Sequence, residues 1–150
     1  MKIHKRIRPL FTIIFLFILS GCAVGTDFYI QNLTDVKKMI TINYKSRVFN
    51  DLKRPFHRDL SFNYEDEIVS PKVFKKIKNL KTLEKIEVRD SSVIMELHPH
   101  STTRIDQTFN ANWYMTINSV DIDGKEYSIK ELEKNAEKIH NDYIYKIKSY

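Results

Sequence analysis

The sequence predicts a mainly β protein, folded as an antiparallel β-sandwich with two short helices. Three observations predict this class. Apolar and polar residues alternate along several short segments, which is the period of a strand that buries one face. Turn-forming residues separate these segments, which recur about every ten residues. This spacing is typical of antiparallel sandwiches. Two segments have helical spacing instead, and each begins at a serine that is suited to cap a helix.

The first strands are expected in the N-terminal half of the chain. Residues 28–31 alternate over a short distance. Residues 40–45 alternate with β-branched side chains, so they predict a half-buried strand. Residues 46–59 show no regular pattern, and Pro55 breaks any helix there. A third strand is expected at 60–64.

The first helix is expected to begin at Ser70, the N-cap, with Pro71 in the first helical position. Four apolar residues then recur at helical spacing: Val73, Phe74, Ile77 and Leu80. The pattern continues to about Lys81. We expect this apolar stripe to face the core.

Further strands are expected between the two helices. A hairpin is predicted at 86–97, and a short strand at 102–105. Residues 113–117 alternate and predict another strand. Residues 120–129 form a second hairpin, because apolar positions flank Asp123-Gly124, a strong signal of a tight turn.

The second helix is expected to begin at Ser128, which forms a capping box with Glu131. Three residues continue the helical spacing: Leu132, Ala136 and Ile139. The helix is expected to end near residues 141–142. Residues 143–147 then alternate as a final strand. The alternative is a helix that continues to Tyr150, because 132, 136, 139 and 143 also share one helical face.

Seven to nine strands of this kind suggest an immunoglobulin-like or transthyretin-like sandwich, and no motif decides between the two. The Cys-Trp-Cys pattern of antibody domains is absent, so the likeness is one of architecture only. Residues 27–150 are expected to form a single domain. A chain of this length can bury a core of its own without a disulfide.

The first 22 residues carry a different pattern. A start with four basic residues and no acid precedes an apolar run at 10–19. A run of about ten residues matches a secretory signal, whereas a transmembrane helix needs about 20. The run leads into Leu19-Ser20-Gly21-Cys22, which contains the one cysteine of the sequence. These four residues resemble the lipobox of bacterial lipoproteins, where the cysteine is diacylated and the chain is cut just before it.

The resemblance implies that residues 1–21 are a cleaved signal peptide, that Cys22 is lipidated, and that 22–26 is a short tether. The protein would then be held to a membrane through the lipid on Cys22. Ala23 replaces the Asp that retains lipoproteins in the inner membrane of well-studied two-membrane bacteria. This favours the outer membrane, facing the periplasm, although a one-membrane host stays open. An uncleaved anchor with a chance cysteine is the alternative.

The charge of the chain argues against nucleic-acid binding. The formal net charge of +6 falls to +2 for residues 22–150, because residues 1–21 hold four Lys and Arg and no acid. A nucleic-acid-binding protein needs a clustered basic face. Only Gly25 and Gly124 remain as glycines after Cys22, so a glycine loop that binds phosphate is excluded.

No pattern predicts a metal or a cofactor. His98 and His100 could hold one metal together with His57 or Asp106. Pro99 disturbs the strand geometry that this would need, so we expect a solvated strand end instead. A structural zinc site also commonly uses thiols, and the one cysteine of the chain is expected to carry lipid.

An enzyme is not expected either. Two close acid pairs, Glu65 with Glu67 and Glu84 with Glu87, are expected by chance in a chain this rich in acids. No nucleophile motif such as Gly-x-Ser-x-Gly occurs. Trp113-Tyr114 could form a ligand platform, but we expect one ring in the core and the other at its edge.

The sequence therefore predicts a non-enzymatic, membrane-anchored envelope lipoprotein that acts as an interaction or structural module, with another envelope protein as partner. The alternative is a periplasmic lipoprotein that binds a small ligand in the Trp113/Tyr114 region, and an unrecognised hydrolase is a third possibility. A concave aromatic cavity beside Trp113 would favour the ligand. A flat exposed apolar patch would favour the protein partner.

Overall fold

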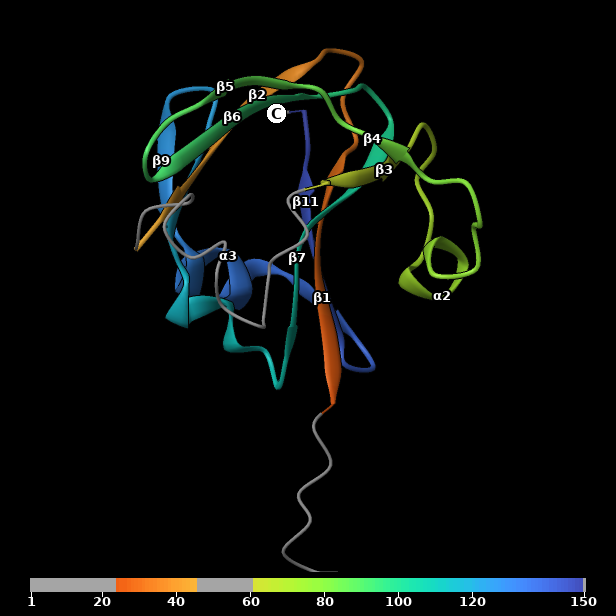
Figure 1. Cartoon of the computed structure of the whole chain (residues 1–150). Helices are drawn as coiled ribbons and strands as arrows, with labels where there is room; N and C mark the ends of the chain where they lie inside the picture. Colours follow the sequence, from red (N-terminus) through yellow and green to blue (C-terminus); the bar gives the residue numbers. More distant parts are fainter. Residues whose placement is uncertain (1–23, 46–60, 150) are drawn as a thin grey trace, which may run out of the picture.

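Two β-sheets face each other in a sandwich, so the predicted mainly β class with two short helices is confirmed (Figure 1). The computed structural model describes residues 24–45 and 61–149. The predicted signal peptide, the tether residues Cys22 and Ala23, and the irregular segment 46–59 lie outside this described part.

The first sheet has the first strand of the domain near its middle. Strand β1 (Gly25–Asn32) pairs antiparallel with β7 (Ser101–Phe109) on one side. On its other side it pairs parallel with β11 (Asp142–Ile147), the last strand. The sheet is completed by β10 (Glu137–Ile139) beside β11, and by β3 (Asn63–Glu65) and β4 (Lys81–Thr82) beyond β7. The parallel pair is the one departure from an antiparallel sandwich among the described strands.

The second sheet is antiparallel throughout. Strand β2 (Lys38–Tyr44) lies in its centre, between β6 (Ser92–Leu97) and β8 (Ile117–Ile122). The edges are β5 (Lys85–Val88) and β9 (Lys125–Ser128). The hairpin turn between β8 and β9 has φ angles of 51° at Asp123 and 82° at Gly124, as the sequence predicts for a tight turn.

The inward-facing residues of both sheets form one core. The alternating positions supply it, among them Phe28, Ile30, Ile40, Ile42, Val93, Met95, Val120 and Ile122. The alternating apolar positions in the sequence are therefore the residues that the strands bury.

A second, smaller cluster covers the outer face of the first sheet. Tyr29 points away from the main core and packs against Phe74 and Ile144. The chain between β3 and β4 lies over this face and is fixed by hydrogen bonds from Gln31 Nε2 to the carbonyl of Val69 (2.9 Å) and from the Val69 amide to Thr102 Oγ1 (3.0 Å). Strand β1 is thus buried on both faces.

The first helix is shorter than its sequence predicts. Helix α2 (Pro71–Phe74) has the predicted cap, because the Ser70 hydroxyl accepts a hydrogen bond from the Val73 amide. It ends at Phe74 rather than near Lys81. Phe74 is buried, whereas Val73 is exposed and the later apolar residues of the stripe are only half-buried. A short helix needs tertiary packing to persist, and Phe74 is the one residue of the predicted apolar stripe that is fully buried.

The strand predicted at 113–117 is wrong for its first residues. Asn112–Met115 form a 3₁₀ turn, η1, and β8 starts only at Ile117. Asn110 and Ala111 have φ angles of 54° and 56°, so the chain turns sharply before η1. This turn directs Trp113 into the core.

The second helix also ends early. Helix α3 (Ile129–Asn135) has the predicted cap, since the Glu131 amide donates to Ser128 Oγ (3.2 Å). Residues after Asn135 form β10 instead of continuing the helix to 141–142. Strand β11 then confirms the predicted final strand and excludes the helix to Tyr150.

The remaining strands lie where the sequence predicts them, but their lengths differ from the prediction. The described residues contain eleven strands, more than the seven to nine expected, because short edge strands carry little pattern. The strand predicted at 102–105 is the much longer β7. Of the strand predicted at 60–64, Leu60 lies outside the described residues. The described part forms β3 only from Asn63, because Phe62 has a φ of 45° and cannot continue an extended strand.

Candidate functional site

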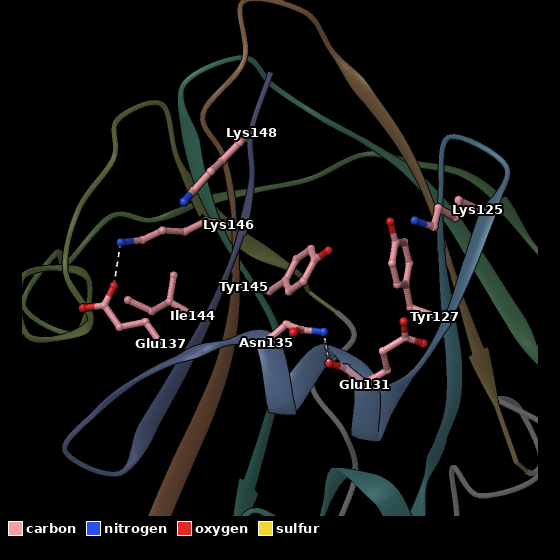
Figure 2. Close-up of a pocket in the computed structure, with 9 residues that line it drawn as sticks. All are labelled: Lys125, Tyr127, Glu131, Asn135, Glu137, Ile144, Tyr145, Lys146 and Lys148. Atoms are coloured by element: carbon pink, nitrogen blue, oxygen red, sulfur yellow. Dashed lines mark hydrogen bonds and ion pairs between the residues drawn. The ribbon is translucent and has the colours of Figure 1, made fainter. Parts of the chain in front are cut away.

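A cleft of about 520 Å³ opens between the edges of the two sheets (Figure 2). One wall comes from β9, the other from β10 and β11, and helix α3 lies between them. Its lining is mostly polar, and the residues that matter below are Lys125, Tyr127, Glu137, Tyr145, Lys146 and Lys148.

The topology of the sheets explains why a cleft forms here. Strand β9 is an edge of the second sheet. Strand β10 pairs with β11 only from Asp142 to Ile144. Beyond Ile144, the described strands flank β11 on the β1 side alone. Two strand edges therefore face the same space, and exposed strand edges offer backbone groups to an added strand.

Two tyrosines face each other across this space. Tyr127 comes from β9 and Tyr145 from β11, and their ring centres are 6.0 Å apart at a tilt of 55°. Both rings pack partly against the main core. Their positions are therefore fixed by the fold, and they offer rigid apolar surface with polar tips to a bound group.

Three lysines and two glutamates, Glu131 and Glu137, line the cleft, so its formal net charge is positive by one. Lys125 Nζ lies 4.9 Å from the ring centre of Tyr127. Lys146 Nζ donates to Glu137 Oε2 at 2.6 Å, so this lysine is already neutralised. Lys148 is exposed and has no ion-pair or hydrogen-bond partner within the described residues. The cleft thus suits an extended segment with acidic groups better than it suits an apolar ligand.

A second polar cluster is buried on the outer face of the first sheet. Asp27 and Asp142 are both buried, and the Asp27 amide donates to Asp142 Oδ1 (3.0 Å). Lys75, which follows α2, donates from Nζ to both Asp142 oxygens (2.8 and 2.7 Å) and lies 3.4 Å from Asp27 Oδ2. Arg104 Nη1 is 3.9 Å from Asp27 Oδ2. This cluster ties the α2 segment to β1 and β11.

Tyr29 completes the cluster as a donor. Its hydroxyl donates to Asp27 Oδ2 at 2.8 Å. Burial, and then the neighbouring Asp27 carboxylate, raise the pKa of this hydroxyl well above its ordinary value. The hydroxyl therefore keeps its proton at physiological pH. No group of three or more potential metal ligands occurs in the described part of the chain, so we interpret the cluster as structural.

His98 and His100 each contact a different carboxylate. His98 Nδ1 lies 3.1 Å from Asp66 Oδ1, and His100 Nε2 lies 2.7 Å from Asp35 Oδ1. Asp106 is buried and belongs to no metal-binding group with them within the described residues. His57 lies in the segment that the structure does not describe.

The aromatic pair is divided in the way the sequence analysis favours. Trp113 is fully buried, whereas Tyr114 is exposed. The two rings therefore do not form an open platform. Of the acid pairs, Glu87 is bound by Arg89 through two hydrogen bonds (2.7 and 2.9 Å), as expected of a solvated surface.

Sequence reasoning did not find the cleft. Tyr127 and Tyr145 were visible as strand residues, but nothing local shows that β9 and β11 are neighbouring edges. One sequence signal could have drawn attention to them. Lysines stand close to a tyrosine in both strands, at 125–127 and at 145–148.

Comparisons with protein-family models, with curated proteins and with solved structures find no match to this chain. Within the described residues, no helix has the length and apolar character that crossing a bilayer requires.

Proposed function

We propose that this chain is a lipid-anchored envelope protein whose β-sandwich binds another envelope protein and has no catalytic activity. The observation that carries the proposal is Leu19-Ser20-Gly21-Cys22 after a basic and apolar leader. Strand β1 begins at Gly25, so Gly25 and Thr26 of the predicted tether belong to the first sheet, and this supports a tether even shorter than 22–26 between lipid and domain. The outer membrane, facing the periplasm, is the favoured location.

The cleft supports binding of a protein segment rather than of a small molecule. Pockets for small ligands are mostly apolar and enclose the ligand. Here the walls are polar and two strand edges are exposed, which suits an extended segment that adds to a sheet. The excess of lysine favours acidic side chains on that segment. The small-ligand alternative at Trp113 loses support because that ring is buried.

Changing Cys22 to serine tests the anchor. Cys22→Ser should abolish incorporation of labelled fatty acid and leave an unprocessed precursor, because a hydroxyl does not replace the thiol in the lipid transfer. The matched control, Ser20→Ala, keeps a small residue and should be labelled normally. Labelling of Cys22→Ser at the normal level would refute the lipoprotein assignment.

Reversing two cleft charges tests the binding site. Lys125→Glu with Lys148→Glu should abolish capture of proteins that the lipidated wild type retains from its own envelope after cross-linking, because acidic groups would then be repelled. The control is Lys72→Glu with Lys78→Glu, two exposed lysines in and after α2 that do not line the cleft. Equal capture by both pairs would show that the cleft is not the binding site.

A further inference from the structure

Exposed apolar side chains occur at the start of β1, at the end of β7 and in η1, which follows the turn after β7. Phe109 ends β7 and is 51% exposed, and Tyr114 and Met115 in η1 are 40% and 65% exposed. Val24, just before β1, is 39% exposed. We call these four residues the apolar end. In Figure 1, β7 descends to the lower end of the sandwich, where β1 begins.

Hydrogen bonds fix the start of the domain to this end. The register places Gly25 opposite Phe109. The Asn110 amide donates to the Val24 carbonyl (2.9 Å), and the Val24 amide donates to Asn110 Oδ1 (3.1 Å). The Ala111 amide donates to Thr26 Oγ1 (3.3 Å). The turn that leads into η1 is therefore held beside the first residues of the domain.

The stretch of sequence that carries Phe109, Tyr114 and Met115 also lacks charge. Residues 107–120 contain no Lys, Arg, Asp or Glu, which makes this the longest stretch without them in residues 22–150. The whole chain is 29% charged, so this stretch of 14 residues differs from the rest of the chain in having no charged side chain. Tyr, Phe and Met are side chains that a membrane interface accepts, whereas charged side chains resist transfer out of water.

Covalent geometry brings this end to the bilayer once Cys22 is lipidated. Val24 is two residue steps from Cys22, and an extended chain spans at most about 3.6 Å per residue, or about 7 Å here. The polar headgroup layer on each side of a bilayer is itself about 5–8 Å thick. A lipid on Cys22 inserted into the hydrocarbon therefore leaves Val24 and its neighbours at the headgroups.

We infer that the apolar end seats on the phospholipid bilayer that holds the lipid of Cys22, with Phe109, Tyr114 and Met115 in the headgroup layer. This inference rests on the proposed lipidation of Cys22. The lipid supplies the attachment, and the apolar end sets the orientation of the domain. The long strands β1 and β7 then stand away from the membrane.

The orientation has a consequence for the cleft. Strand β11 runs parallel to β1, and Ile147 lies opposite Asn32, the residue of β1 farthest from the membrane. Seven residue steps along β1 correspond to about 23 Å. Lys148 is therefore presented away from the bilayer, toward a partner.

Depth-dependent quenching tests the inference on the full lipidated protein. Once Cys22 carries lipid, an introduced cysteine is the one free thiol, so Met115→Cys and, as control, Lys148→Cys can each carry a fluorophore. The proteins are reconstituted in phosphatidylethanolamine vesicles with brominated lipids. We expect the Met115→Cys probe to be quenched at least about threefold more than the Lys148→Cys probe, since the latter lies some 20 Å farther out. Equal quenching at both sites would overturn the inference.

A second variant separates seating from attachment. Phe109→Asp in the Met115→Cys background should reduce the quenching of the probe several-fold while the lipid remains on the protein. Mass spectrometry of the same sample reports the lipid. Lipidated protein with no preferential quenching refutes the apolar end alone, whereas protein without lipid refutes the proposed function and this inference with it. Because Phe109 is exposed, thermal stability should stay unchanged, which excludes unfolding as the cause.

Discussion

Replacing Trp113 with alanine should lower the free energy of unfolding by about 3–5 kcal/mol, the range for deleting a large buried aromatic side chain. Trp113 is fully buried and meets the rings of Phe28 (5.2 Å, 81°) and Tyr143 (5.0 Å, 76°) edge to face. Its indole Nε1 donates to Glu133 Oε2 at 3.0 Å. The substitution removes these contacts and leaves a cavity where η1, β1 and β11 meet. Urea unfolding followed by circular dichroism measures the change.

The neighbouring tyrosine is the matched control. Tyr114→Ala removes an exposed ring, so it should change the free energy of unfolding by no more than about 0.5 kcal/mol. Trp113→Phe should fall between the two, because the ring contacts partly survive and the hydrogen bond to Glu133 is lost. Equal stability of the Trp113→Ala and Tyr114→Ala proteins would contradict the burial of Trp113.

Replacing Lys75 with methionine should lower the free energy of unfolding by about 2–3 kcal/mol. Removing one partner of a fully buried ion pair costs about 3–5 kcal/mol, and the value is reduced here because the Lys75 side chain is 41% exposed to solvent. The variant leaves Asp27 and Asp142 beside each other with Arg104, at 3.9 Å, as the remaining cation. Chemical denaturation measures the loss. Limited proteolysis should also show faster cleavage of the chain around α2.

Two further variants isolate the ionic contribution. Lys76→Met changes an exposed neighbour and should be close to neutral. Asp142→Asn in the Lys75→Met background removes one of the two carboxylates and should recover part of the lost stability. If Lys75→Met and Lys76→Met unfold at the same denaturant concentration, Lys75 does not hold the α2 segment on the sheet.

The local features of the fold could be predicted because their causes are local. The alternation around Ile40 and Met95 indicates one buried face of each strand. Asp123 and Gly124 favour the positive φ angles that the tight turn requires. Ser70 and Ser128 cap their helices through hydrogen bonds that reach only three residues. Each of these signals is complete within a few residues of sequence.

The rest depends on residues that are distant in sequence. Both helices end, at Phe74 and Asn135, before the helical pattern of the sequence does. Trp113 looks like a strand residue until the turn at Asn110 and Ala111 is known. The cleft depends on which strands become edges, and this follows from the pairing of β11 with β1. The anchoring of Cys22 stays a prediction from its sequence pattern.

The neighbouring position of β1 and β11 bears on when the domain can fold. Asp27 and Asp142, which meet in these strands, are 115 residues apart. A chain that enters a secretion channel by its N-terminus delivers β1 first and β11 last. The first sheet cannot close until nearly the whole chain has crossed, and contacts of such long range form slowly. If the chain is exported as we propose, this arrangement would keep the polypeptide unfolded during export and would couple folding of the domain to its complete release from the channel.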